Sequence, residues 1–196
     1  MTDFEKKTRW VVITGAPSSG KTSVIDDLRA RGYAVQDEVA RELIELALRQ
    51  GLSLDDVRRD GGQQLQQDIL RIKRAREAAL DPAQQVFMDR GMPDSIAYFR
   101  LAGMKPDAAF TACRMYRYEA VFIFDRLPLV KDGVRAEDEA VAQKIDGMLR
   151  ADYAALGYTP VSVPVVPVAA RTDMILQHLR LPDRKSTRLN SSHLVI

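Results

Sequence analysis

The chain has 196 residues, 46% of them apolar, and a single cysteine. This length predicts one domain with a sizeable core, and one cysteine excludes an internal disulfide. No window approaches the run of about 18 apolar residues that marks a membrane helix. The first residues, MTDFEKKTRW, lack the apolar stretch of a secretory signal, so we expect a cytoplasmic protein without a membrane span.

The formal net charge of +2 arises in the C-terminal segment. Residues 183–196 contain three basic side chains and one acidic side chain, and the rest of the chain is balanced, which gives no indication of nucleic-acid binding. The sequence DRKSTRLNSSH at 183–193 resembles the translation of a sequencing-adapter oligonucleotide. We therefore expect one domain over residues 1–182 and a non-native, disordered tail at 183–196, the alternative being an ordinary polar tail.

The first half of the chain alternates short apolar runs with helical patterns. RWVVIT at 9–14 predicts a buried strand, and apolar residues at helical spacing predict a helix at 23–31. A second strand is expected at 33–36 and a strongly helical segment at 39–50. A polar helical region follows at 54–82, which the glycine pair at 61–62 should interrupt.

The second half repeats the alternation. In chain order we expect a strand at 85–89, helices at 93–103 and 107–118, a strand at 120–125, a charged loop at 126–138, a helix at 139–157, a strand at 159–166 and a helix at 169–180. Strands that alternate with helices predict a parallel sheet covered on both faces, because crossover helices must pack against it. The predicted fold class is therefore α/β, a three-layer sandwich around a five-stranded parallel sheet.

Residues 15–22, GAPSSGKT, fit the P-loop pattern G-x-x-x-x-G-K-T/S and lie between the first strand and the first helix. Such a turn points backbone N–H groups at phosphate oxygens, and the helix start adds the positive end of its dipole. Lys21 should reach the β- and γ-phosphates, and Thr22 should bind Mg²⁺. The alternative is an ordinary strand-to-helix turn. The expected nucleotide-binding residues are Gly15, Ala16, Pro17, Ser18, Ser19, Gly20, Lys21, Thr22 and Ser23.

Charged residues also follow the third strand, at the sheet edge where open α/β sheets bind ligands. Asp89 ends this strand and is predicted to coordinate or order the magnesium, the alternative being a cap of the next helix. Arg90 is expected either to hold the transferring phosphate or to pair with an acid.

Acidic residues follow the second strand at the same edge. Glu38 is the preferred general base, which would take a proton from an acceptor hydroxyl, whereas Asp37 is better explained as a helix cap. Arg41 lies one turn further on and is expected either to bind substrate or to pair with Glu45.

The charged loop at 126–138 carries Arg126, Lys131 and Arg135. A basic loop that closes over the phosphates would supply positive charge and exclude water, so Arg126 and Arg135 are further catalytic candidates. The alternative is a solvated surface loop. Cys113, on a predicted helix, is expected to be a small buried residue rather than a nucleophile.

Four segments carry a resemblance to a known family. ITGAPSSGKTSVIDDLRARGYAVQDEVARELIE, FMDRGMPDSIAYFRLAG, YRYEAVFIFDRLP and LGYTPVSVPV resemble a small AAA-labelled P-loop family, which is similar to the ribosylnicotinamide kinase domain of bacterial NAD-regulator proteins. The resemblance covers about residues 9–180 and implies a kinase-like core. In such kinases an acid after the second strand acts on the acceptor and an acid–arginine pair follows the third, roles that match Glu38, Asp89 and Arg90. Adenylyl transfer, DNA binding and a hexameric motor are not implied.

The sequence thus favours a P-loop kinase that uses Mg²⁺ and ATP to phosphorylate a small nucleoside-like acceptor. The absence of an N/T-K-x-D signature makes GTP the less favoured nucleotide. A kinase needs an acceptor pocket between the 37–50 helix and the polar helices at 54–80. The first alternative is a regulatory ATPase or GTPase switch, which needs no such pocket, and the second is a binding module without turnover. The sequence gives no indication of an oligomeric state.

Overall fold

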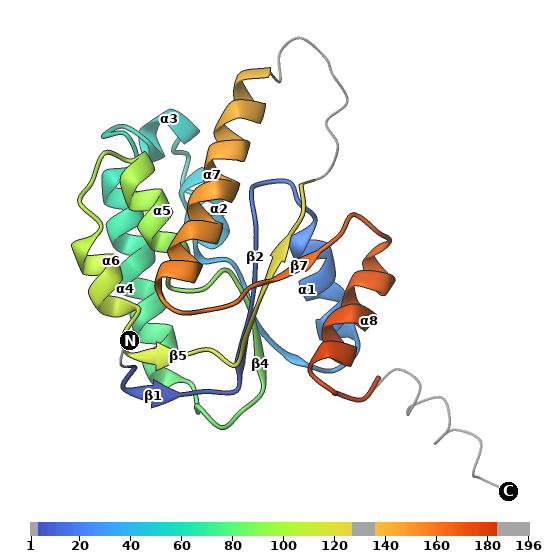
Figure 1. Cartoon of the computed structure of the whole chain (residues 1–196). Coiled ribbons are helices and arrows are strands. Elements are labelled where there is room, and N and C mark those ends of the chain that lie inside the picture. The colour runs from blue at the N-terminus through green and yellow to red at the C-terminus, as the bar shows by residue number, and fades with distance from the viewer. Residues whose placement is uncertain (1–3, 127–135, 184–196) are drawn as a thin grey trace, which may run out of the picture.

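A computed structural model describes residues 4–126 and 136–183, except for the side chains of residues 136–139. Its centre is a parallel five-stranded sheet in the order β3-β4-β2-β6-β7 (Figure 1). Both the three-layer α/β fold and the five predicted strands are confirmed. The strands are β2 (Trp10–Thr14), β3 (Ala34–Gln36), β4 (Val86–Asp89), β6 (Ala120–Phe124) and β7 (Val161–Val163).

Helices join these strands. The helices are α1 (Lys21–Ala30), α2 (Val39–Arg49), α3 (Leu54–Val57), α4 (Gln63–Ala79), α5 (Asp94–Leu101), α6 (Asp107–Ala112), α7 (Ala136–Ala155) and α8 (Val168–His178). The region at 54–82 divides at its glycine pair, as predicted, because Gly61 and Gly62 both take left-handed backbone angles that glycine adopts without strain.

The central strand β2 is apolar throughout because it supplies both layers of the core. Val11 and Ile13 pack with side chains of α1 and α8. Trp10 and Val12 pack with side chains of α4, α5, α6 and α7 on the opposite face, where Cys113 is also buried. A strand covered on both faces loses the polar–apolar alternation of a half-exposed strand.

The helix expected at 107–118 is too long. The observed α6 ends at Ala112, and β5 (Tyr116–Arg117) pairs in parallel with β1 (Lys6–Lys7) in a separate small sheet. The ring of Tyr118, which follows β5, is buried in the core, so tertiary packing overrides the local helical pattern. The last strand is also shorter than the expected 159–166, because prolines flank it and cannot donate ladder hydrogen bonds.

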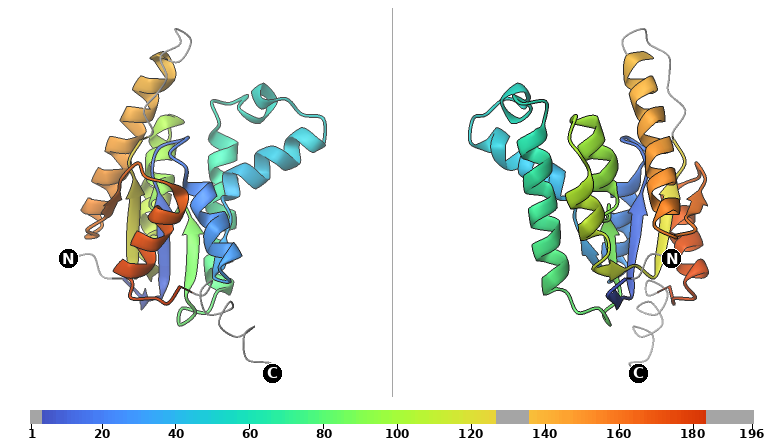
Figure 2. Two further views of the ribbon diagram at one scale, coloured as in Figure 1. Left: turned by 90° about the vertical axis from the view of Figure 1, so that its right-hand side faces the viewer. Right: turned by 60° about the vertical axis from the view of Figure 1, so that its left-hand side comes forward.

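The arrangement in space places α2 and α3 beside the sheet rather than over it. Figure 2 shows these two helices standing out from the body of the molecule, with α4 linking them back to it. Residues 127–135, including Lys131 and Arg135, and residues 184–196 lie outside the described residues. No helix in the described part of the chain is long and apolar enough to cross a membrane.

Candidate active site

The P-loop takes a backbone path that two glycines permit. Gly15 has φ 143°, and a Cβ there would lie 2.9 Å from the backbone oxygen of Phe124 on the neighbouring strand β6. Gly20 has φ 85° and caps the start of α1. Both positions therefore exclude larger residues, one through a close approach and the other through a left-handed conformation.

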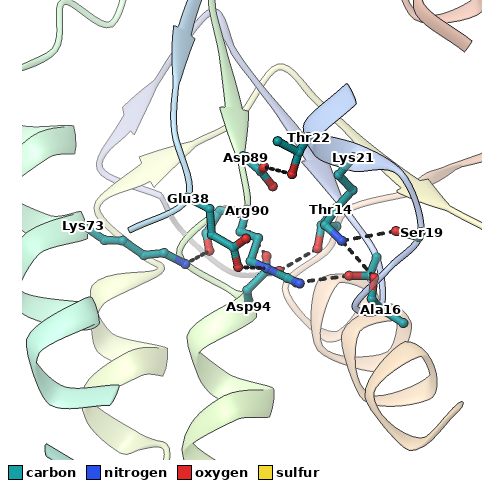
Figure 3. Close-up of polar contacts among 12 residues, drawn as sticks. Thr14, Ala16, Ser19, Lys21, Thr22, Glu38, Lys73, Asp89, Arg90 and Asp94 are labelled. Carbon is teal, nitrogen blue, oxygen red and sulfur yellow. Dashed lines mark hydrogen bonds and ion pairs between the residues drawn. The ribbon is translucent and has the colours of Figure 1, made fainter. Parts of the chain in front are cut away.

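Lys21 folds back onto the P-loop (Figure 3). Its ammonium donates hydrogen bonds to the backbone oxygen of Ala16 at 2.8 Å and to Ser19 Oγ at 3.2 Å. Burial, aided by the nearby Arg90, lowers the pKa of Lys21 to about 8. A bound polyanion would favour the charged form of this lysine, because an opposite charge offsets the desolvation.

Thr22 and Asp89 face each other at the end of β4. Thr22 Oγ1 lies 3.4 Å from Asp89 Oδ2, and Asp89 Oδ1 is buried without a hydrogen-bond partner among the described residues. Burial raises the pKa of Asp89 to about 6, and the like charge of Glu38 adds to this effect. The Thr22 hydroxyl and a carboxylate with one unbonded oxygen fit Mg²⁺, because this ion prefers oxygen ligands and completes its coordination shell with water and phosphate.

Arg90 pairs with acids, one of the two alternatives expected for it. Its Nε donates to Glu38 Oε1 at 2.6 Å, and its Nη1 donates to Asp94 Oδ1 and to the backbone oxygen of Gly15, both at 3.1 Å. The residue is 8% exposed and has a left-handed φ of 69°, a strained backbone for a non-glycine residue. These bonds hold the loop, the acid after β3 and the start of α5 in one fixed arrangement.

Asp94 is the centre of a buried hydrogen-bond network that the sequence analysis did not single out. Besides Arg90 it accepts hydrogen bonds from Thr14 Oγ1 and Tyr153 OH, both at 2.6 Å, and from the backbone of Gly91 at 3.1 Å. Burial favours the neutral carboxyl, but Lys73 and Arg90 outweigh it and lower the pKa of Asp94. In the sequence, an acid at the start of a helix is indistinguishable from a simple cap.

Glu38 precedes α2 and faces the P-loop across a cavity. One carboxylate oxygen is bonded to Arg90, and its side chain does not cap the helix. The prediction that Asp37 caps this helix is wrong, because α2 has no side-chain cap and Asp37 pairs with Arg29 of α1. Lys73 of α4 approaches the same region and donates to the backbone oxygen of Gly91 at 2.7 Å.

The cavity has a volume of about 700 Å³ and lies between the P-loop and α2, α4 and α5. The P-loop side is polar and contributes residues 17–22. The opposite wall is mainly apolar and contains Ile44, Leu65, Ile69, Tyr98, Leu101 and Ala102. This is the position expected for an acceptor pocket, beside the helix after the second strand and the polar helices that follow.

The remaining residues that the sequence predicts for the site divide into those that line this cavity and those that do not. Arg41 lines it and does not pair with Glu45, which instead bonds to Arg49. Arg126 follows β6 and is described, but it is not among the lining residues. Ser23 is exposed on α1 and does not line the cavity either.

A residue far along the chain makes a buried hydrogen bond to the P-loop. Arg171 of α8 is buried and donates from Nη1 to the backbone oxygen of Ser19 at 2.7 Å. Its guanidinium also lies over the ring of Phe124. No local motif marks this arginine, because its role depends on how α8 packs against α1.

Comparison with known proteins identifies the family. The profile of a family described as an AAA domain matches residues 10–171, and the chain belongs to this family. No curated protein matches the chain.

Solved structures share the fold at low identity. A NadR protein in complex with NR is 17% identical with a TM-score of 0.63, covering 90% of this chain. This chain spans about half of that NadR chain, 51%. Thymidylate kinase from Ehrlichia chaffeensis (13% identity, TM-score 0.59) covers 88% of this chain, and 98% of the kinase is covered in turn. Deoxyadenosine kinase from M. mycoides (14% identity, TM-score 0.57) covers 87% of this chain, and 98% of that kinase is covered in turn. The predicted resemblance and the kinase-like fold are confirmed.

Proposed function

We propose that this chain binds Mg-ATP at the P-loop and transfers the γ-phosphoryl group to a hydroxyl or phosphate of a small nucleoside-like acceptor. The main support is that one cavity joins the P-loop, residues 17–22, to the apolar wall formed by α2, α4 and α5. One structural neighbour is a complex with NR, and the deoxyadenosine kinase holds dcmp, so related folds hold compounds of this size.

On the nucleotide side, Lys21 would leave its bonds to the loop and contact the β- and γ-phosphates. Thr22 and Asp89 would hold Mg²⁺, which neutralises charge on the phosphates when it is bound. Backbone N–H groups at the start of α1 would bind the same phosphates, since they have no partner within the helix.

On the acceptor side, Glu38 would act as the base. One of its oxygens is fixed by Arg90, which orients the carboxylate toward the cavity that Glu38 lines. With a hydroxyl acceptor, the acceptor oxygen bonds to the γ-phosphorus as the bond from that phosphorus to the β–γ bridging oxygen breaks. The hydroxyl proton passes to Glu38, and ADP leaves. Arg90 acts here as a positioning residue.

The test is whether ADP release from ATP and Mg²⁺ depends on the acceptor. Candidate nucleosides and nucleotides are added singly to the purified protein, and a large stimulation by one of them supports transfer. ADP release that no acceptor changes would support the regulatory NTPase instead. The Lys21→Ala variant should bind ATP about 100-fold more weakly, because it loses charge-assisted hydrogen bonds to phosphate. Unchanged binding in that variant would contradict the site assignment itself.

A further inference from the structure

The cavity wall carries more positive charge than the protein neutralises. Four basic residues line it besides the P-loop lysine, and Glu38 is the one carboxylate among the described lining residues. Two of the four, Lys73 and Arg90, are held by protein oxygens. The side chains of the other two, Arg41 and Arg58, make no hydrogen bond or ion pair with any described residue, although the side chains of the nearby Arg49 and Arg59 do.

The position of Arg41 is unfavourable for helix stability. It is the third residue of α2 and therefore lies in the first helical turn. The backbone N–H groups at a helix start carry partial positive charge, so a cation there is disfavoured and an anion is favoured. Arg58 follows the last residue of α3 and lines the same cavity. An anion bound between these two arginines would offset the cost at Arg41 and neutralise the charge of Arg58.

A buried hydroxyl at the same cavity is also without a partner. Ser95 of α5 lines the cavity and is 2% exposed, and its Oγ makes no hydrogen bond to any described residue. A buried polar group without a partner is costly, and such groups in native structures are usually satisfied by water or ligand. The unpartnered hydroxyl of Ser95 is an observation independent of the two arginines. It offers a ligand one further polar contact beside the apolar wall.

We infer that the acceptor carries an anionic group, a phosphate or a carboxylate, held by Arg41 and Arg58. This inference rests on the proposed function, since it concerns the acceptor side of the same cavity. Arginine suits this role because its planar guanidinium binds either group through two parallel hydrogen bonds. The apolar wall with Tyr98 would accommodate a flat ring in the same compound.

The experiment compares matched neutral and anionic compounds by calorimetry, with the nucleotide site filled by AMP-PNP and Mg²⁺. The pairs are thymidine against TMP, adenosine against AMP, and shikimate methyl ester against shikimate. We expect the anionic member of at least one pair to bind at least about 10-fold more tightly, the scale of one charge-assisted hydrogen bond. The nucleotide pairs report on phosphate, and the shikimate pair reports on carboxylate.

The doubly substituted variant Arg41→Gln/Arg58→Gln should lose this preference. Arg49→Gln/Arg59→Gln is the matched control, because those arginines are exposed on the same segments and paired with Glu45 and Asp56. AMP-PNP affinity should stay within about twofold of the parent in both variants, since neither pair is assigned to the triphosphate. If it falls in the first variant, the arginines bind the triphosphate and the inference is wrong.

The remaining outcomes separate this inference from the proposed reaction. Equal affinity for neutral and anionic members, or no binding of any compound, overturns the inference. Phosphorylation of neutral acceptors as fast as anionic ones also overturns it, yet leaves the kinase proposal intact. Arginine-dependent binding of an anionic compound without phosphoryl transfer supports an anion site at these arginines and contradicts its assignment to a kinase acceptor.

Discussion

The two sides of the cavity are built differently. On the nucleotide side, buried side chains such as Lys21, Arg90 and Asp94 are bonded to one another or to the loop backbone. On the acceptor side, α2 buries Val39 alone among its residues, and leucines including Leu46 and Leu48 are exposed on it. The difference is visible in Figure 2, where α2 and α3 stand away from the sheet.

Under the proposed function, this contrast would allow one fold to keep its phosphate site and change its acceptor. A binding site for phosphate needs donors fixed in advance, so it is supported by the core. An acceptor site can be adjusted by changing exposed side chains, because those changes cost little stability. The following substitutions test this division, starting with the largest expected effect.

Glu38→Gln should reduce phosphoryl transfer about 1000-fold, because a positioned general base contributes roughly 10²–10⁴ to the rate. ATP affinity should stay within about twofold, since the amide oxygen of glutamine can still accept the bond from Arg90. Single-turnover kinetics and a nucleotide titration measure the two quantities. Asp37→Asn is the control, because this exposed neighbour pairs with Arg29 outside the cavity. A Glu38→Gln variant with normal turnover would exclude Glu38 as the base.

Asp94→Asn should lower the free energy of unfolding by about 3 kcal/mol, because it removes one partner of a buried ion pair. The change also disturbs the bonds from Thr14 and Tyr153, so the P-loop should lose its fixed arrangement. Urea unfolding measures the stability. Asp26→Asn provides the comparison, because its pair with Arg29 is solvent-exposed and should contribute less than about 1 kcal/mol. Equal effects of the two changes would contradict the central role of the Asp94 network.

Much of the fold and half of the site follow from local sequence patterns. The strands, the P-loop and the acids after β3 and β4 are recognisable because each depends on neighbouring residues. Asp94 and Arg171 are not recognisable, since their partners lie far away in sequence: Thr14 and Tyr153 for Asp94, and Ser19 for Arg171. The sequence also could not decide between the two roles of Arg90, because the choice depends on the distance between two loops.

The misassigned helix at 107–118 shows the same limit in the fold. Its C-terminal part has a helical pattern, yet Tyr118 OH donates to the buried Glu77 of α4 at 2.6 Å and accepts from the backbone of Met92. These tertiary contacts require the chain to be extended after α6. Local propensity is too weak to compete with several buried contacts of this kind.

Glu77 makes the stability dependent on pH. Burial raises its pKa to about 7 in the folded protein, against 4.5 for an unperturbed glutamate. The folded state therefore binds more protons than the unfolded state in this range, and stability falls as pH rises from about 4.5 to about 7. Between about pH 5.5 and pH 8 the loss should be about 2 kcal/mol.

Urea unfolding at both pH values, on the parent and on Glu77→Gln, isolates this contribution. The Glu77→Gln variant should not lose stability between the two pH values. Its free energy of unfolding should therefore rise relative to that of the parent at the higher pH. An identical pH dependence in both proteins would mean that Glu77 is ionised in the folded state throughout.

The smallest expected effect belongs to Arg171→Leu, which separates stability from nucleotide affinity. The buried Nε of Arg171 has no partner among the described residues, and burial lowers the pKa of its guanidinium, so the arginine is not well solvated. Replacement by leucine should change the free energy of unfolding by less than about 1 kcal/mol, because an unsatisfied buried group is removed together with one hydrogen bond. AMP-PNP affinity should nevertheless fall about threefold, since the backbone oxygen of Ser19 loses the hydrogen bond that ties the P-loop to α8. Gln177→Met, an exposed change on the same helix, should alter neither quantity. If Arg171→Leu binds AMP-PNP as tightly as the parent, the P-loop keeps its shape without support from α8, and the preformed side of the site is smaller than the buried network implies.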